Sequence, residues 1–291
     1  MKYWQSSFLC EGDQLFDVAR AAESVGFHGM LVSDHLVHPE KQDSKYLYSA
    51  DNKPPQFRED TLWPEAWSLI GGLAAITEKL HFCTNIYILP LRHPLEVAKA
   101  TGSLGYFSKG RVHMGVGVGW MKEEFDMMGV DFHTRGKRMD ECIEVIRKLQ
   151  TGKYVEHHGQ FFDFPRIIMT PVPPRPVPIL IGGTSEPALR RAARTGDGWV
   201  APPQTIAQTI ETLGTLDRLR REYGTRNKPF DTNVAVWDEK PVTPADVRRL
   251  EDAGATDYTI YPFTYTIGPN TTIAQKRAEM ERVAEELIAR T

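Results

Sequence analysis

An aspartate followed by a histidine is the first pair of residues in this chain that could do chemistry. Asp34 and His35 come directly after a short apolar run, residues 29–33. Histidine side chains exchange protons near neutral pH, so His35 is a candidate proton donor or acceptor for a reacting oxygen atom. We expect Asp34 either to orient His35 or to accept hydrogen bonds from a heterocyclic ligand. The alternative interpretation is a loop histidine beside an aspartate that caps a helix.

Alternating glycines mark another apolar run, residues 112–118. Gly115, Gly117 and Gly119 lack the G-x-G-x-x-G spacing and do not follow the first strand, so they are a weak dinucleotide-binding signal. Glycines at this level of a barrel allow a flat ring to approach the backbone. We therefore expect Gly117 and Gly119 to contact a cofactor ring, whereas close packing is a sufficient explanation for Gly115.

A third group, Gly182-Gly183-Thr184-Ser185, lies between a predicted strand and a predicted helix. Free N–H groups at a helix start, together with two hydroxyl groups, are well suited to an anion such as phosphate. Glu186 in the first turn opposes an anion, and a plain helix cap at Ser185 is the alternative. A plain cap would leave the two glycines unexplained, so we favour phosphate binding.

Two histidine pairs are not assigned to a metal or to catalysis. His35 and His38 have H-x-x-H spacing, but no helix is expected there and no third ligand is evident, so we predict no metal site. His157 and His158 lie in a predicted hairpin and are expected on the surface. The charged residues between 135 and 141 alternate in sign at helical spacing, which is typical of a salt-bridged face.

A long polar segment, residues 36–62, follows the second predicted strand. Loops of this length in a compact barrel usually cover or shape a site. Tyr46 and Tyr48 of this segment are expected to contact the substrate or to anchor the loop.

The elements that must position these residues alternate regularly between apolar β-type runs and amphipathic helices. The predicted strands are residues 3–9, 29–33, 80–89, 112–118, 177–181, 198–201, 231–237 and 257–262. The predicted helices are residues 14–25, 64–76, 94–107, 137–149, 186–195, 206–223, 243–253 and a last helix that includes residues 280–288. This alternation predicts one domain, residues 1–291, folded as a (β/α)8 TIM barrel with insertions after strands two and four. The second insertion, residues 151–176, is read as a hairpin followed by a proline-rich connection.

Composition excludes several classes of protein. Hydrophobic residues make up 41% and charged residues 25%, and the net charge of −3 arises from interspersed signs, so neither nucleic acid nor a membrane surface is an expected partner. No apolar stretch approaches the roughly 20 residues that cross a bilayer. Cys10, Cys83 and Cys142 are scattered and odd in number, which predicts reduced, buried thiols and a cytoplasmic location.

Several of these residues together carry a resemblance to a known family. Ser33-Asp34-His35, residues 89–94, Gly115–Trp120 with Glu124-Phe125, Arg135 with residues 138–141, and Ile181-Gly182-Gly183 with Asp197-Gly198-Trp199 resemble the bacterial luciferase-like flavin and deazaflavin oxidoreductases. The chain is most similar to the actinobacterial subgroup that uses the deazaflavin coenzyme F420. The resemblance implies a barrel with the tricyclic ring in its mouth and the phosphate at the helix after strand five.

The resemblance also implies roles for individual residues. His35 matches the proton-transfer histidine and Asp34 the cofactor-contacting aspartate, while Gly182 and Gly183 match the phosphate loop. Asn85 and Ile86 match the bulge behind the ring, which is often a non-proline cis peptide.

Two positions depart from the sugar-phosphate dehydrogenases of the family. Trp120 stands where those enzymes carry an acid, and Pro39 stands where they carry a tryptophan. The departures argue against glucose-6-phosphate, and Trp120 suggests a flatter, more apolar small-molecule substrate.

The function implied is hydride transfer between F420 and an alcohol, carbonyl compound or activated alkene. An FMN-dependent monooxygenase that uses reduced flavin and O2 is the alternative enzyme, and a non-catalytic flavin-binding relative is the alternative outside enzymes. The family further implies a homodimer, with residues 66–76 and 95–104 as candidate contact faces.

Overall fold

Parallel strands form a closed barrel in the computed structural model, which describes every residue except 47, 50–57 and 239. The barrel strands are β1 Lys2–Ser6, β2 Gly29–Val32, β3 His81–Thr84, β5 Val112–Gly117, β8 Ile179–Gly182, β9 Gly198–Val200, β10 Asp231–Val234 and β11 Asp257–Ile260. In the described part of the chain these eight strands pair in parallel in the order β3, β2, β1, β11, β10, β9, β8, β5, and a β3–β5 pairing closes the ring. The predicted (β/α)8 barrel is confirmed.

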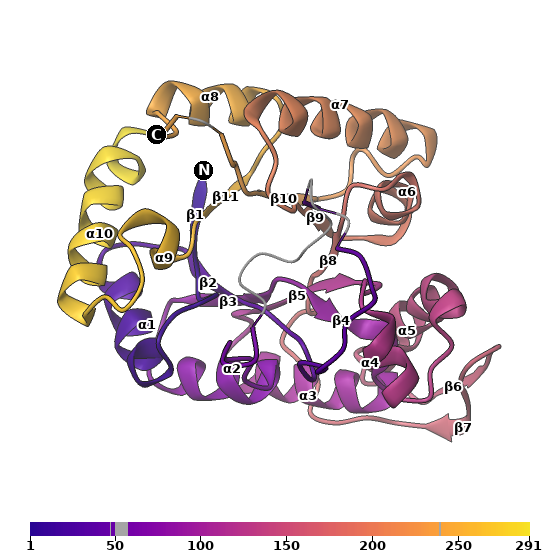
Figure 1. The fold of residues 1–291 in the computed structure, drawn as a ribbon. Coiled ribbons are helices and arrows are strands. Elements are labelled where there is room, and N and C mark those ends of the chain that lie inside the picture. Colours follow the sequence, from indigo (N-terminus) through magenta and orange to yellow (C-terminus); the bar gives the residue numbers. More distant parts are fainter. Residues whose placement is uncertain (47, 50–57, 239) are drawn as a thin grey trace.

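Helices surround the barrel, as the view along its axis in Figure 1 shows. They are α1 Leu15–Ser24, α2 Ala66–Ala75, α3 Pro94–Phe107, α4 Lys122–Met127, α5 Arg135–Leu149, α6 Glu186–Thr195, α7 Ile206–Glu222, α8 Pro244–Asp252, α9 Phe263–Thr266 and α10 Ile273–Glu286, with short 3-10 turns at Gly12–Gln14, Leu89–Leu91, Phe132–Thr134 and Ile288–Arg290. The start of α8 shows how local sequence fixes where a helix begins. The Thr243 side chain accepts a hydrogen bond from the Asp246 N–H, and the Asp246 side chain accepts one from the Thr243 N–H. Such a capping box satisfies two N–H groups that a helix start leaves unpaired.

The third predicted strand is interrupted. β3 ends at Thr84, the peptide bond between Asn85 and Ile86 is cis, and a short strand, β4 Tyr87–Ile88, then pairs with β5. The expected bulge is confirmed, and it divides what the sequence predicts as one strand, residues 80–89.

The insertion before β8 contains the predicted hairpin, formed by β6 Val155–His158 and β7 Asp163–Ile167. The prediction that both hairpin histidines lie on the surface is wrong for His157, which is buried, whereas His158 is exposed. Successive side chains of a strand point to opposite faces, so only one of the pair can face α5. His157 Nε2 lies 3.2 Å from Glu141 Oε1, and Glu141 also accepts from the Phe162 N–H at 2.8 Å.

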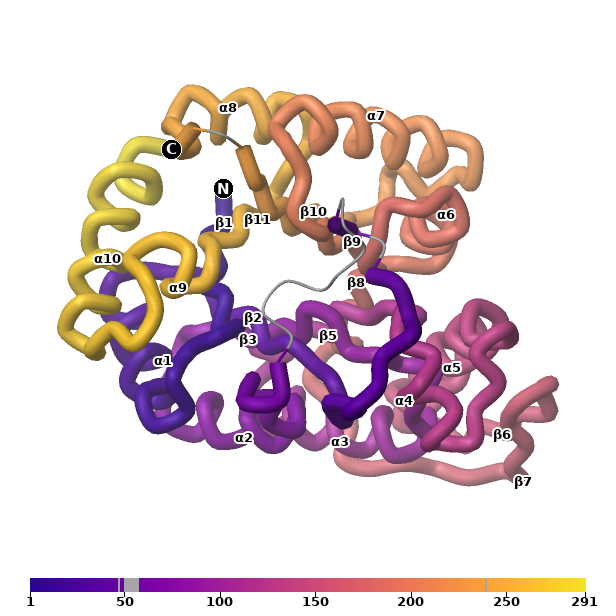
Figure 2. The backbone as a smooth tube through the Cα atoms, in the orientation of Figure 1, coloured from indigo at the N-terminus to yellow at the C-terminus, as the bar shows by residue number. Residues whose placement is uncertain are grey.

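The smoothed backbone in Figure 2 shows the first and last parts of the chain side by side at the closure of β1 with β11. Cys10, Cys83 and Cys142 are free and buried, as predicted. Among the helices of the described residues, none combines the length and the apolar character that a bilayer crossing requires.

Candidate active site

The residues singled out from the sequence follow the C-terminal ends of the barrel strands, where barrel enzymes carry their active sites. His35 comes three residues after β2, and the Asn85–Ile86 bulge comes directly after β3. Trp120 follows β5, and the Gly183 loop follows β8. The barrel therefore brings these separate segments to one mouth.

His35 is held by a carboxylate from a distant part of the chain. Its Nδ1 atom lies 3.2 Å from Oε2 of Glu124, a residue of α4 that is fully buried. Glu124 Oε1 accepts a second hydrogen bond, from the Leu36 N–H, at 2.6 Å. A carboxylate in this position favours the proton on Nδ1, which leaves Nε2 as the atom able to accept a proton.

Asp34 makes hydrogen bonds to two groups at the barrel mouth, and its expected contact with a cofactor stays a prediction. Its Oδ1 atom pairs with Arg92 Nη2 at 2.7 Å, and its Oδ2 atom accepts from the Ile88 N–H at 2.9 Å. Burial raises the pKa of the Asp34 carboxyl, and the Arg92 guanidinium opposes that rise. Asp34 therefore ties the end of β2 to β4, and Glu124 is the residue that orients His35.

The glycines at the end of β5 and just after it lie against side chains of the Asn85–Ile86 segment and β4. A Cβ on Gly117 would lie 2.6 Å from the Ile86 side chain, and one on Gly119 would lie 2.7 Å from the side chain of Ile88. Gly182 likewise faces Ile86, at 2.7 Å. The absence of a side chain at Gly117 and Gly119 therefore lets Ile86 and Ile88 pack behind the mouth. The expected contact of these two glycines with a cofactor ring stays a prediction.

The Gly182–Ser185 loop has features suited to an anion. Gly183 has a φ of +104°, which L-residues rarely adopt, and the Trp199 indole N–H donates to its carbonyl at 2.8 Å. Ser185 occupies the N-cap position of α6 in an extended conformation, but its side chain makes no capping hydrogen bond. Glu186, the expected objection to an anion, is paired with Arg190 at 3.0 Å. Thr184 and Ser185 thus directly precede a ten-residue helix, whose unpaired N-terminal N–H groups favour an anion.

Aromatic side chains line the mouth beside His35. The Trp120 ring lies 5.8 Å from the His35 ring and 5.3 Å from the Tyr46 ring, both in edge-on arrangements. Burial raises the pKa of Tyr46 to about 12, so its phenol stays protonated at neutral pH. Tyr48 contacts Tyr46, but its hydroxyl also lies 3.1 Å from where a Gly183 Cβ would be. Tyr48 therefore borders the anion loop as well as the predicted substrate side.

Several residues near the barrel mouth were not predicted from the sequence. Trp63 packs 4.9 Å from the His35 ring, and Trp237 packs 4.9 Å from Tyr261. Trp237 and Tyr261 follow β10 and β11, so their position after strand ends was an available signal. Glu123 was also missed: its Oε1 accepts from the N–H groups of residues 43 and 44, which fastens the long loop to α4.

Comparison with known proteins places this geometry in context. A family model described as luciferase-like monooxygenase matches residues 11–290. An uncharacterized protein of Mycobacterium tuberculosis is 41% identical over 275 residues, which is 94% of each chain. An F420-dependent glucose-6-phosphate dehydrogenase of Nakamurella multipartita is 29% identical over 261 residues, covering 82% of this chain and 72% of that one.

Solved structures share the fold at lower identity. The monooxygenase RslO1 from Streptomyces bottropensis superposes with a TM-score of 0.77 at 18% identity, over 99% of both chains. An F420-dependent secondary alcohol dehydrogenase, solved with an F420-acetone adduct, superposes with a TM-score of 0.74 at 17% identity, over 100% of both chains.

Proposed function

The chain belongs to the luciferase-like monooxygenase family, and from this premise we propose that it is an oxidoreductase that depends on coenzyme F420. The proposed reaction transfers a hydride between the deazaflavin and an alcohol, a carbonyl compound or an activated alkene. The observation that carries the proposal is the His35–Glu124 pair, which holds a proton-transfer group at the mouth of the barrel. F420-dependent dehydrogenases among the relatives support the choice of cofactor.

The residues at the mouth fit a phosphate-bearing cofactor. Gly183 keeps the loop before α6 free of a side chain, and Thr184 and Ser185 offer hydroxyl and N–H donors. The Asn85–Ile86 bulge would support the ring, with Gly117, Gly119 and Gly182 giving Ile86 the room to do so. When bound, the deazaflavin supplies the ring carbon that gives or takes the hydride.

His35 would handle the proton that accompanies this transfer. In alcohol oxidation its Nε2 atom accepts the hydroxyl proton, and in carbonyl reduction the protonated ring returns it. Glu124, already bonded to Nδ1, stabilises the imidazolium that forms and fixes the ring's orientation. Asp34 binds Arg92 and the Ile88 N–H, and these hydrogen bonds fix the end of β2 relative to β4.

The aromatic lining supports a flat, largely apolar small molecule as the substrate. The rings of Trp120, Tyr46 and Tyr48 contact one another in edge-on arrangements. Position 120 is a tryptophan, so it offers no carboxylate to a sugar hydroxyl. We therefore do not propose glucose-6-phosphate.

A direct experiment is to purify the protein from a host that makes both F420 and FMN, and to record the absorbance and fluorescence of the retained ligand. We expect a deazaflavin spectrum. Retention of FMN alone would contradict the proposal and favour the second candidate, a monooxygenase that uses reduced flavin and O2. The structural similarity to the monooxygenase RslO1 is the observation that favours this candidate. A protein that binds either ring but shows no turnover would support the non-catalytic alternative.

Assembly and location complete the proposal. We propose a cytoplasmic homodimer with contacts through residues 66–76 and 95–104, on α2 and the first part of α3. Light scattering at micromolar concentration tests the dimer, and a monomeric mass would contradict it.

A further inference from the structure

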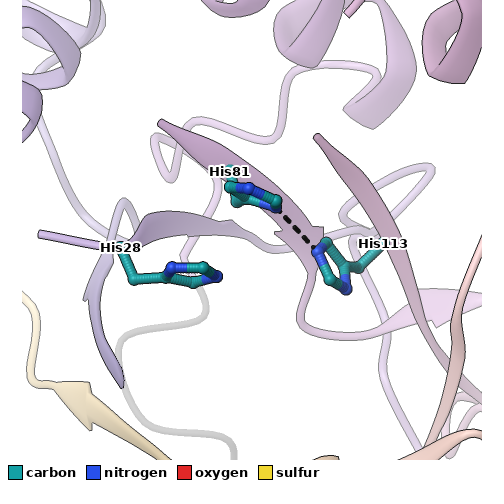
Figure 3. Close-up of side chains that lie close together, drawn as sticks. All are labelled: His28, His81 and His113. Atoms are coloured by element: carbon teal, nitrogen blue, oxygen red, sulfur yellow. Dashed lines mark hydrogen bonds between the residues drawn. The ribbon is translucent and has the colours of Figure 1, made fainter. Parts of the chain in front are cut away.

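Three imidazoles meet at the end of the barrel opposite the proposed active site. His28 directly precedes β2, His81 begins β3 and His113 is the second residue of β5, three strands that are neighbours in the barrel (Figure 3). One ring nitrogen from each lies within 4.8 Å of the other two. Among the described residues, no other group of three histidines, cysteines or acids brings its ligand atoms this close together.

From this juxtaposition we propose that His28, His81 and His113 bind a divalent transition-metal ion of the zinc class. Imidazole nitrogens suit zinc, nickel, copper and cobalt, and a set of three protein ligands leaves a fourth position for water. The site lies outside the proposed cofactor site and does not depend on it.

The distances require only a small adjustment. His81 Nδ1 and His113 Nε2 are already 3.0 Å apart, joined by a hydrogen bond. Bonds of about 2.0–2.1 Å to a tetrahedral ion place two nitrogens roughly 3.3–3.4 Å apart, so this pair needs to separate slightly. The nitrogen that donates in this hydrogen bond must also pass its proton to the other nitrogen of its own ring, so that both atoms offer a lone pair to the ion. His28, whose ring lies nearly parallel to that of His81 at 4.4 Å between centroids, must turn its nitrogen inward.

His28 is free to make that turn. It lies in the connection before β2, is partly exposed, and no described residue forms a hydrogen bond with its ring nitrogens. His113 is the most buried of the three, and Trp4 packs edge-on against both His28 and His113. The cluster therefore has two fixed ligands in the barrel and one adjustable ligand at its solvent side.

Electrostatics keep the three rings in the form that binds metals. Burial lowers the pKa of His81 to about 3, that of His113 well below its usual value, and that of His28 as well, so all three are neutral at pH 7. Lys2 and Arg175 lower these pKa values further and disfavour a cation. Lys2 is itself paired with Asp231 at 2.9 Å and Asp257 at 3.4 Å, which offsets its charge.

A bound ion would tie together the starts of β2, β3 and β5. The N-terminal end of a barrel contributes to stability rather than to chemistry. We therefore expect the ion to stabilise the fold, because a ligand that binds only the folded state raises its stability.

The test uses tag-free, EDTA-treated protein titrated with Co2+ and, separately, with Zn2+. We expect one Co2+ per chain with the visible absorption of a tetrahedral site, a micromolar or tighter Kd, and a rise in Tm of about 5 °C at saturating Zn2+. His28→Ala should weaken Co2+ binding at least about tenfold without unfolding the protein. His158→Ala, which removes an exposed histidine of the hairpin, is the matched control and should change nothing.

A second variant separates ligation from packing. His81→Asn places an amide nitrogen near the position of Nδ1, so it can still donate to His113 while losing the imidazole ligand. Loss of the Co2+ absorption in a folded His81→Asn protein supports the site. Failure of the wild type to bind Co2+ or Zn2+, or binding that survives both His28→Ala and His81→Asn, overturns it.

Discussion

Replacing Glu124 with glutamine should reverse the proton position on His35 while leaving the fold intact. Glu124 Oε1 accepts the Leu36 N–H at 2.6 Å, and Oε2 lies 3.2 Å from His35 Nδ1. In Glu124→Gln the amide oxygen is expected to keep the Leu36 contact, so the NH2 group faces Nδ1 and donates to it. Nδ1 must then accept, which places the single proton of the neutral ring on Nε2.

The size of the effect follows from these contacts. One hydrogen bond to a carboxylate becomes a hydrogen bond between neutral groups, so the free energy of unfolding should fall by only about 1–2 kcal/mol. The proton-accepting atom is lost, however, so turnover in the oxidative direction should fall by about 10²–10⁴-fold, the usual contribution of a general base.

The assay does not require the substrate. Long-range ¹H–¹⁵N spectra of histidine-labelled protein, recorded at about pH 8.5 where free imidazole is neutral, show which ring nitrogen carries the proton. Wild-type protein should show the proton of His35 on Nδ1, and Glu124→Gln should show it on Nε2. Glu123→Gln, the neighbouring residue on α4, holds the loop without touching His35 and is the matched control. A proton on Nε2 in the wild type, or identical His35 signals in wild type and Glu124→Gln, would refute the assignment of Glu124.

The remaining predictions concern stability. A Cβ on Gly115 would lie 1.9 Å from the Thr84 carbonyl oxygen, so Gly115→Ala should lower the free energy of unfolding by about 3 kcal/mol or more, whereas Gly214→Ala on α7, with open space around it, should leave it equal or raise it. Urea titration of both variants checks this, and equal stabilities would contradict the contact. Burial lowers the pKa values of His81 and His113, so below about pH 6.5 the unfolded chain binds more protons than the folded one. The free energy of unfolding is therefore undiminished above that pH and decreases as the pH falls toward the folded-state pKa values. At pH 5 each histidine that the fold keeps neutral should lower the free energy of unfolding by about 2 kcal/mol. Urea titrations at pH 8 and pH 5 should show a smaller decrease for His81→Asn than for the wild type. An equal decrease in both proteins would count against this explanation.

Much of the fold could be predicted because the barrel repeats a local pattern. The apolar β-type runs and the amphipathic helices, such as α1 with Leu15, Val18 and Ala22 on one face, carry their periodicity in the sequence. The periodicity does not predict the split of the third strand, and only the family resemblance indicated the cis peptide between Asn85 and Ile86. α4 was missed because it is six residues long and largely charged.

The site was predictable in its parts but not in its contacts. His35 and the loop before α6 stand at strand ends, where punctuation residues mark them. The partner of His35 is 89 positions away, and no local spacing relates it to Glu124. The meeting of His28, His81 and His113 depends on the register of β2, β3 and β5, which becomes visible only when the strands are aligned.

The central claim, that the barrel mouth binds a deazaflavin through the loop before α6, is tested most directly by fluorescence titration of F420 and FMN into wild type, Ser185→Ala and Ser185→Asp. Aspartate is a good N-cap residue, so Ser185→Asp should keep or raise Tm while its charge opposes the cofactor phosphate. We predict that wild type binds F420 more tightly than FMN, that Ser185→Asp weakens F420 binding at least about tenfold, and that Ser185→Ala has a smaller effect. Tighter binding of FMN, or F420 affinity unchanged in Ser185→Asp, would contradict the claim.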